Sequence, residues 1–184
     1  MNDNTQNPWT TLRSRQIYDN PWISVREDQV INPSGGEGIY GVVSFKNLAI
    51  GIIPLDEQGH TWLVGQYRYT LDAYSWEIPM GGGPLGIDPL ESARRELREE
   101  TGLVARQWQK ILTVHTSNSV TDEVGYVYLA RELSQHTPDF DDTEVLQLQK
   151  LPLAQAAQMV LRGEITDSLS VGGLLAAHRL INTP

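Results

Sequence analysis

The stretch GGGPLGIDPLESARRELREETGL, residues 81–103, carries more structural information than any other part of the chain. It opens with glycines and continues with apolar residues at helical spacing. Asp88 is a favourable N-cap, Pro89 suits the first helical position, and Glu91 completes a capping box. Gly102 stands where a glycine commonly ends a helix. These signals predict a glycine-rich loop followed by an amphipathic helix that packs on a sheet.

Three glutamates, Glu96, Glu99 and Glu100, occupy positions i, i+3 and i+4 of this helix and therefore share one face. Carboxylates at this spacing repel each other in an isolated helix, so helix stability gives no reason to gather them. A hard cation such as Mg²⁺ does give a reason, because it binds carboxylate oxygens, water and phosphate. The alternative is a solvated acidic face balanced by neighbouring arginines, but that interpretation leaves the adjacent glycine loop unexplained.

Gly81 and the run RELREETGL (residues 95–103) resemble the Nudix box, whose pattern is G-x5-E-x7-R-E-U-x-E-E-x-G-U, where U is a bulky aliphatic residue. One position departs from it: Ile87 stands where the family has a glutamate that pairs with the box arginine, here Arg95. We expect Glu91, four residues before Arg95, to take over this pairing. We expect Ile87 to be a buried staple residue before the helix cap. The alternative is that Ile87 marks a domain that has lost catalytic activity.

The resemblance extends to NPWISVREDQVINPSGGEGIYGVV (residues 20–43) and QYRYTLDAYSWEIPMGG (residues 66–82), which are similar to the ADP-ribose pyrophosphatase branch of the family. This branch hydrolyses nucleoside diphosphate sugars. The resemblance implies the Nudix fold, an α/β (α+β) arrangement with a mixed β-sheet between helices and an N-terminal antiparallel β region. It also implies a homodimer in which the N-terminal strands exchange contacts and both subunits build the active site.

The same resemblance assigns a metal site to the predicted helix. Glu96, Glu99 and Glu100 are expected to bind Mg²⁺ together with a main-chain carbonyl near Gly81, and an all-oxygen site leaves Mn²⁺ open as well. Glu99 and Arg95 are further expected to take part in catalysis.

Three residues upstream of the box fall where the branch contacts its substrate: Arg68, Glu77 and Trp76. Arg68 and Glu77 fit equally well as a structural ion pair beside a sheet. Trp76 fits as a surface on which a base stacks, although an aromatic residue near a strand more commonly belongs to the core.

The loop SNSVTDE (residues 117–123) ends in two carboxylates. Glu123 resembles the general base that activates water in this branch, and Asp122 is the second candidate. The alternative is ordinary turn chemistry. Asn118 stands near the place where the branch often has a proline associated with ADP-ribose, so the preferred base and sugar stay open.

The implied reaction is attack of water on a diphosphate linkage, which gives a nucleoside monophosphate and a sugar phosphate. For ADP-ribose these products are AMP and ribose 5-phosphate. Bound Mg²⁺ would neutralise the developing charge and lower the pKa of the attacking water. Two alternatives remain: a catalytically impaired Nudix domain that acts as a nucleotide-sugar sensor, and hydrolysis of RNA ends by the same fold.

Composition limits the partners. The chain has 184 residues, no cysteine, and a net charge of −9 from 14 basic and 23 acidic residues. The lack of cysteine excludes a disulfide scaffold and a thiolate metal site. An acidic chain repels nucleic-acid backbones, and the basic group Arg94, Arg95 and Arg98 lies among as many glutamates, so we expect no nucleic-acid partner. The longest apolar stretch, residues 48–55, is too short to cross a bilayer.

The N-terminus is polar and lacks the apolar segment of a signal peptide, so we expect a cytoplasmic protein with no membrane partner. Residues 1–45 are predicted to form the N-terminal β region and residues 46–184 the Nudix domain. In the first region two strands flank the turn NPSGGEG (residues 32–38), and in the second LAIGIIPL (48–55) and WLVGQYRY (62–69) are interpreted as a hairpin. Further strands are expected at 110–116, 124–131 and 143–149, and helices near 152–162 and 167–180, of which 172–180 suits the core better than an interface.

Overall fold

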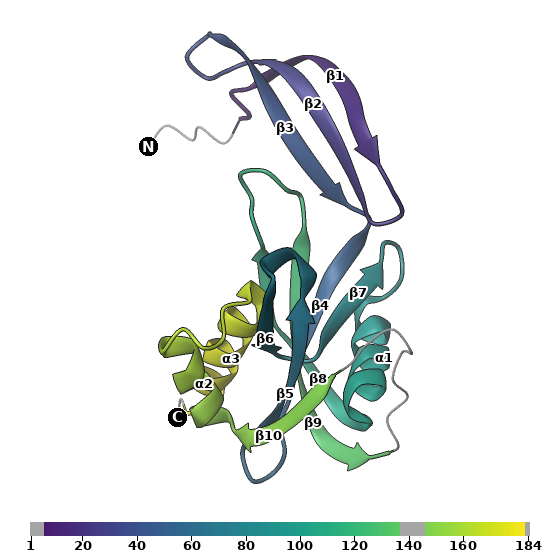
Figure 1. Cartoon of the computed structure of the whole chain (residues 1–184), viewed down its shortest axis with the longest axis vertical. Coiled ribbons are helices and arrows are strands. Elements are labelled where there is room, and N and C mark those ends of the chain that lie inside the picture. The colour runs from purple at the N-terminus through teal and green to yellow at the C-terminus, as the bar shows by residue number, and fades with distance from the viewer. Residues whose placement is uncertain (1–5, 137–145, 183–184) are drawn as a thin grey trace. The chain divides into compact units, whose positions relative to one another are not determined.

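The computed structural model describes residues 6–136 and 146–182 of the chain (Figure 1). Its tertiary contacts separate into two compact units. The first contains the described residues up to Lys46 together with the loop Ser117–Glu123, and the second contains Asn47–Thr116 and the described residues from Val124 onward. The division predicted after residue 45 does not include this loop, because its contacts with the first unit are not encoded in the local sequence.

The N-terminal unit is built on a three-stranded antiparallel sheet in the order β1-β2-β3 (Figure 1). Its strands are β1 (Thr10–Asp19), β2 (Ile23–Ile31) and β3 (Glu37–Phe45). The predicted turn between β2 and β3 is held by the Asn32 side chain, which accepts hydrogen bonds from the Ser34 and Gly36 N–H groups at 2.9 and 3.0 Å. Strand β1 is not predicted from the sequence, because all of its residues are exposed and no buried face marks it as a strand.

The second unit contains a mixed four-stranded sheet in the order β7-β4-β9-β8 and a three-stranded antiparallel sheet in the order β10-β5-β6. Strand β4 runs parallel to β9, and the other pairs of the mixed sheet are antiparallel. The strands are β4 (Asn47–Pro54), β5 (His60–Arg68), β6 (Ala73–Glu77), β7 (Met80–Pro84), β8 (Leu103–His115), β9 (Val124–Gln135) and β10 (Gln147–Pro152), with a short 3₁₀ turn η1 (Tyr69–Leu71) between β5 and β6.

The predicted hairpin between β4 and β5 is wrong, because the two strands belong to different sheets. The turn between them exists, and the Asp56 side chain accepts hydrogen bonds from the Gln58 and His60 N–H groups at 3.0 and 2.8 Å. Strand β4 is apolar, and its residues from Ile50 onward are buried, so it suits a central position with a neighbour on each edge. It finds these neighbours in β7 and β9 instead of β5.

Helices cover both faces of the mixed sheet, as predicted. Helix α1 (Pro89–Thr101) lies on one face and α3 (Ser168–Ile181) on the other, and α2 (Leu153–Leu161) packs against α3 and against β5 and β10 (Figure 1). Strand β4 faces both layers alternately: Ile50 and Ile52 pack in the core under α1, whereas Ile53 packs in the core under α2 and α3. Of the residues 172–180 expected in the core, Gly173, Leu174 and Ala177 of α3 are buried, whereas Arg179 and Leu180 are exposed.

Several predicted boundaries change. The glycine-rich segment begins as strand β7 instead of a loop, β6 is an additional strand, and β8 starts at Leu103 instead of Lys110. Of the strand predicted at 143–149, residues 143–145 lie outside the described residues, and the described part forms the start of β10. Across residues 6–136 and 146–182, no helix combines the length and the apolar character needed to cross a membrane.

Candidate active site

Helix α1 is fixed at both ends by the signals present in its sequence. The Asp88 carboxylate accepts a hydrogen bond from the Leu90 N–H at 3.0 Å, and Pro89 occupies the first turn. Gly102 ends the helix in the left-handed conformation with φ 68°, and its N–H donates to the Arg98 carbonyl at 2.9 Å. The cap is the simple form and not the reciprocal capping box, because the Asp88 side chain bonds to position N2. The glutamates of α1 therefore stand on a helix with well-defined ends.

Two of the three predicted metal-binding glutamates are buried. Glu96 is 8% exposed and Glu100 is 4% exposed, whereas the Glu99 side chain is 38% exposed. Glu100 accepts a hydrogen bond from the Met80 N–H of β7 at 2.9 Å. A buried carboxylate is unfavourable unless charge or hydrogen bonds compensate it. The fold therefore holds two carboxylates at the junction of α1 and β7 where little water reaches them.

Gly81 is in direct contact with this acidic site. A Cβ atom at residue 81 would lie only 2.1–2.4 Å from the three carboxyl atoms of Glu96. No larger side chain fits there unless Glu96 moves. The structure thus brings Glu96, Glu100 and the main chain at Gly81 together, as the sequence predicted for a metal site.

Arg95 connects the glutamates to β7. Its guanidinium donates to Glu99 at 2.9 Å, to Glu96 at 2.5 Å and to the Gly82 carbonyl at 3.0 Å. The expected pairing of Arg95 with Glu91 is wrong, since Arg95 forms its ion pairs with Glu96 and Glu99 instead. The residue that replaces the box glutamate, Ile87, is 49% exposed, so its prediction as a buried staple residue is also wrong. Arg95 remains anchored to the glycine-rich strand without the box glutamate.

The donor set suits a hard divalent cation, since it consists of carboxylate and carbonyl oxygens. In the arrangement seen here, no group of three or more acidic or histidine side chains among the described residues is positioned to hold a metal ion. The Arg95 guanidinium is bonded to two of the three carboxylates and supplies the positive charge at this place. A metal ion bound by Glu96 and Glu99 would therefore compete with Arg95 for their carboxylate oxygens.

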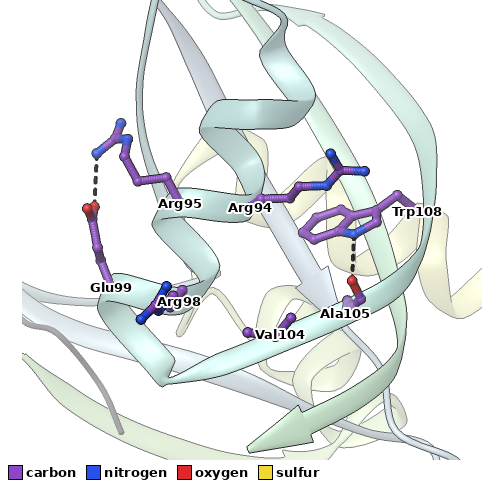
Figure 2. Close-up of a pocket in the computed structure, with 7 residues that line it drawn as sticks. All are labelled: Arg94, Arg95, Arg98, Glu99, Val104, Ala105 and Trp108. Carbon is purple, nitrogen blue, oxygen red and sulfur yellow. Dashed lines mark hydrogen bonds and ion pairs between the residues drawn. The ribbon is translucent and has the colours of Figure 1, made fainter. Parts of the chain in front are cut away.

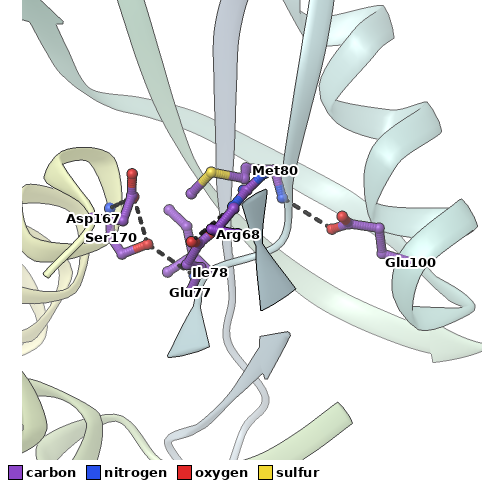
Figure 3. Close-up of polar contacts among 7 residues, drawn as sticks. All are labelled: Arg68, Glu77, Ile78, Met80, Glu100, Asp167 and Ser170. Carbon is purple, nitrogen blue, oxygen red and sulfur yellow. Dashed lines mark hydrogen bonds and ion pairs between the residues drawn. The ribbon is translucent and has the colours of Figure 1, made fainter. Parts of the chain in front are cut away.

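Arg68 and Glu77 form a bidentate ion pair across the β5–β6 hairpin (Figure 3). The Arg68 Nε–H donates to both Glu77 oxygens, at 3.0 and 3.1 Å, and Glu77 is 2% exposed. The hydrogen-bonded Glu77 raises the pKa of Arg68, and the charges of Asp167 and Glu100 raise it further. The structural alternative foreseen for this pair is therefore present, and a substrate contact stays a prediction. Trp76 is half-buried and packs edge-on against Tyr74 with ring centroids 5.7 Å apart, so it too has a structural contact, and its role in stacking on a base stays a prediction.

The segment between β6 and β7 is held from both helical layers (Figure 3). The Ile78 N–H donates to the buried Ser170 hydroxyl at 3.0 Å, and that hydroxyl donates to the Asp167 carboxylate at 2.8 Å. On the other side, Glu100 holds the Met80 N–H. The sequence predicts a helix from residue 167 onward but gives no signal for the bond between Ser170 and Ile78, which are 92 residues apart. These two hydrogen bonds hold residues 78–80 in place, directly before Gly81.

The candidate general base lies on a loop of the N-terminal unit. The loop Ser117–Glu123 is attached to β3, where Asp122 accepts a hydrogen bond from the Phe45 N–H at 3.1 Å. The Tyr40 hydroxyl donates to the Ser119 carbonyl at 2.8 Å. Asp122 therefore has a structural role in the loop, in line with the alternative of ordinary turn chemistry given for this segment. Glu123 is half-buried, and its assignment as the base stays a prediction.

Comparison with known proteins supports this description. A family model described as the NUDIX domain matches residues 45–168, and one described as the nucleoside diphosphate sugar hydrolase N-terminal domain matches residues 9–43. The chain is 35% identical to an ADP-ribose pyrophosphatase from Mycobacterium tuberculosis, over 94% of this chain and 84% of the relative. It is 30% identical to an ADP-ribose pyrophosphatase from Bacillus subtilis, over 86% of each.

A crystal structure of an ADP compounds hydrolase has the same fold, with a TM-score of 0.84, 20% sequence identity and 94% of each chain covered. The Nudix match spans more than half of the sequence and includes the helix, the three glutamates and the glycine strand described above. The chain belongs to the Nudix family of hydrolases.

Proposed function

We propose that this Nudix hydrolase cleaves the diphosphate bond of nucleoside diphosphate sugars such as ADP-ribose in a metal-dependent reaction. The products would be a nucleoside monophosphate and a sugar phosphate, AMP and ribose 5-phosphate in the case of ADP-ribose. The observation that carries the proposal is the pair of buried carboxylates, Glu96 and Glu100, held against the glycine strand at Gly81. The names of the two relatives and the N-terminal domain match support the substrate class.

Glu96, Glu99 and Glu100, with the Gly81 carbonyl, would hold Mg²⁺, and Mn²⁺ fits the same oxygen donors. When bound, the metal would neutralise phosphate charge and lower the pKa of water. Such neutralisation matters because the chain carries a net charge of −9 and its substrate is an anion. As Glu96 turns to the metal, the Arg95 guanidinium would become available to a phosphate oxygen, for which its planar donors are well suited.

The remaining residues would bind substrate and move a proton. Arg68, anchored on the buried Glu77, would contact the substrate, and Trp76 would offer a face for its base. Glu123 would accept a proton from water as the water oxygen adds to phosphorus, and the bond from phosphorus to the bridging oxygen would break. The leaving phosphate would carry the released negative charge.

We further propose that the protein works as a homodimer through its N-terminal sheet. Large apolar side chains on this sheet are solvent-exposed within the chain, among them Ile39 at 70%, Leu12 at 56% and Tyr18 at 54%. A sheet of three strands with this much exposed apolar surface gains stability when a second sheet covers it. Light scattering coupled to size exclusion should give twice the mass of the chain, and a monomer at micromolar concentration would contradict the proposal.

The function is tested by incubating the protein with a panel of nucleoside diphosphate sugars, with Mg²⁺, with Mn²⁺ and with chelator, and identifying products by chromatography. We expect metal-dependent formation of a nucleoside monophosphate, abolished in Glu100→Gln. Glu91→Gln is the matched control, since Glu91 is an exposed acid on the same helix and should leave turnover unchanged. A protein that shows thermal stabilisation by one of these compounds but no turnover would instead be a sensor, and the catalytic assignment would be wrong.

A further inference from the structure

A cavity of about 600 Å³ lies between α1 and the first half of β8 (Figure 2). We call it the α1–β8 groove. At one end it is lined by Arg95 and Glu99, which belong to the candidate metal site, and Trp108 lines its other part. Its volume is in the range of pockets that hold one small organic molecule. Its lining residues are Arg94, Arg95, Arg98, Glu99, Val104, Ala105 and Trp108.

The α1–β8 groove is positively charged although the chain as a whole carries −9. Three arginines line it against one carboxylate, and that carboxylate, Glu99, is already bonded to Arg95. Arg94 and Arg98 are exposed and form no ion pair with any residue of the described ranges. The sequence does not predict this excess of positive charge, because arginines and glutamates are mixed along α1. Only the structure shows that Glu96 and Glu100 are buried. The two exposed guanidinium groups are therefore available to an anion such as a phosphate group.

The other part of the groove offers a planar ring in a fixed orientation. The Trp108 indole N–H donates to the Ala105 carbonyl at 3.0 Å, and the ring packs edge-on against Tyr128 with centroids 6.4 Å apart. Arg94, drawn with Trp108 in Figure 2, lines the same groove from α1. Val104 and Ala105 add apolar surface between the charged and the aromatic parts. A planar aromatic ligand can stack on such a surface.

We propose that the α1–β8 groove binds a free nucleoside monophosphate, with the phosphate at Arg94 and Arg98 and the base at Trp108. A phosphate alone would leave the aromatic part unused, and an uncharged nucleoside would leave the arginines unused. The choice of a nucleoside monophosphate rests on the proposed function, because this is the class of product that the hydrolysis would release. The groove is then a second nucleotide site that needs no metal.

The test is calorimetric titration of AMP into the wild-type protein with chelator present, so that a metal-dependent active site contributes nothing. We expect one bound nucleotide per chain, equally in the wild type and in Glu100→Gln. The double variant Arg94→Gln/Arg98→Gln should weaken AMP binding by about tenfold or more. Arg106→Gln is the matched control. Arg106 is an exposed arginine on β8, the strand that carries Trp108, but it lies outside the groove and pairs with Glu132.

Each other outcome overturns the proposal. Absence of AMP binding with chelator excludes a metal-free nucleotide site, and equal binding by the double variant places the site elsewhere. Inorganic phosphate that binds as tightly as AMP shows an anion site without a base, and a single-stranded oligonucleotide that binds much more tightly shows a nucleic-acid surface instead. Turnover with Mg²⁺, measured on the same wild-type protein, separates the two proposals. Wild type that binds AMP without metal but shows no hydrolysis refutes the proposed function, and wild type that hydrolyses substrate but binds no AMP without metal refutes the groove.

Discussion

Replacing Gly81 by alanine should inactivate the enzyme while leaving it folded. The new Cβ atom would lie 2.1 Å from the Glu96 carboxyl carbon and 2.2 and 2.4 Å from its two oxygens. Gly81 has no left-handed backbone conformation, so the substitution adds no backbone strain. The whole effect therefore falls on the position of the Glu96 carboxylate.

The size of the effect follows from this contact. Non-bonded carbon atoms pack at about 3.5 Å, so the carboxylate must retreat by roughly 1 Å or more. A misplacement of about 1 Å in a catalytic group lowers the rate on the order of 100-fold. The retreating group is the end of a flexible side chain, so the free energy of unfolding should fall by only about 1–3 kcal/mol, as in other overpacked sites.

The assay is kcat/KM for ADP-ribose at saturating Mg²⁺, together with urea unfolding of each variant. Gly82→Ala is the matched control, because the nearest atom to its new Cβ would be the Asn47 amide nitrogen at an ordinary 3.4 Å. We expect Gly82→Ala to retain activity and Gly81→Ala to lose it. If Gly81→Ala stays within about threefold of the control, Glu96 does not act from this position, and the reasoning is refuted.

Three further predictions concern two charged pairs and one buried hydrogen bond of the second unit. Arg68→Met should lower the free energy of unfolding by roughly 3 kcal/mol, measured in urea, because it leaves Glu77 buried without its counter-charge; an unchanged unfolding midpoint would show that water compensates Glu77. Ser170→Ala should cost about 1–3 kcal/mol in the same assay, since a main-chain N–H loses its acceptor; no change would mean that a water replaces the hydroxyl. Burial raises the pKa of Asp56, but Lys150 and two backbone N–H groups outweigh it, and the net pKa lies below the ordinary 3.8. The folded-state pKa is thus depressed, so the stabilisation is present above pH 3.8 and is lost as the pH falls through the folded value. Wild type should therefore exceed Asp56→Asn in stability at pH 6, and the gap should narrow as the pH falls below 3.8; a gap that is independent of pH would contradict this assignment.

Local signals in the sequence predict the part of the site that lies on α1. Asp88 and Gly102 determine the helix ends through hydrogen bonds to neighbouring residues, so the sequence identifies them without knowledge of the fold. The spacing of the glutamates then follows from helix geometry. The tight fit of Gly81 on Glu96 agrees with the motif, whose glycine lies at a fixed distance from the helix in the sequence.

Contacts between distant segments account for the rest. The hairpin prediction for β4 and β5 failed because strand periodicity says which residues are buried and not which strand is the neighbour. The prediction that Ile87 is buried failed for a similar reason: the sequence shows an apolar residue before a cap, but only the packed structure shows that this residue stays about half exposed. The bond between Ser170 and Ile78 and the attachment of Asp122 to β3 depend on tertiary structure alone.

The central claim is that the α1 glutamates form a metal-dependent hydrolytic site. The most direct measurement is the rate of ADP-ribose hydrolysis as a function of free Mg²⁺, for the wild type and for Glu100→Gln. We expect no turnover with chelator, saturable activation by Mg²⁺, and loss of activity on the order of 1000-fold in the folded variant. Turnover that persists in chelator, or a Glu100→Gln variant as active as the wild type, would contradict this claim.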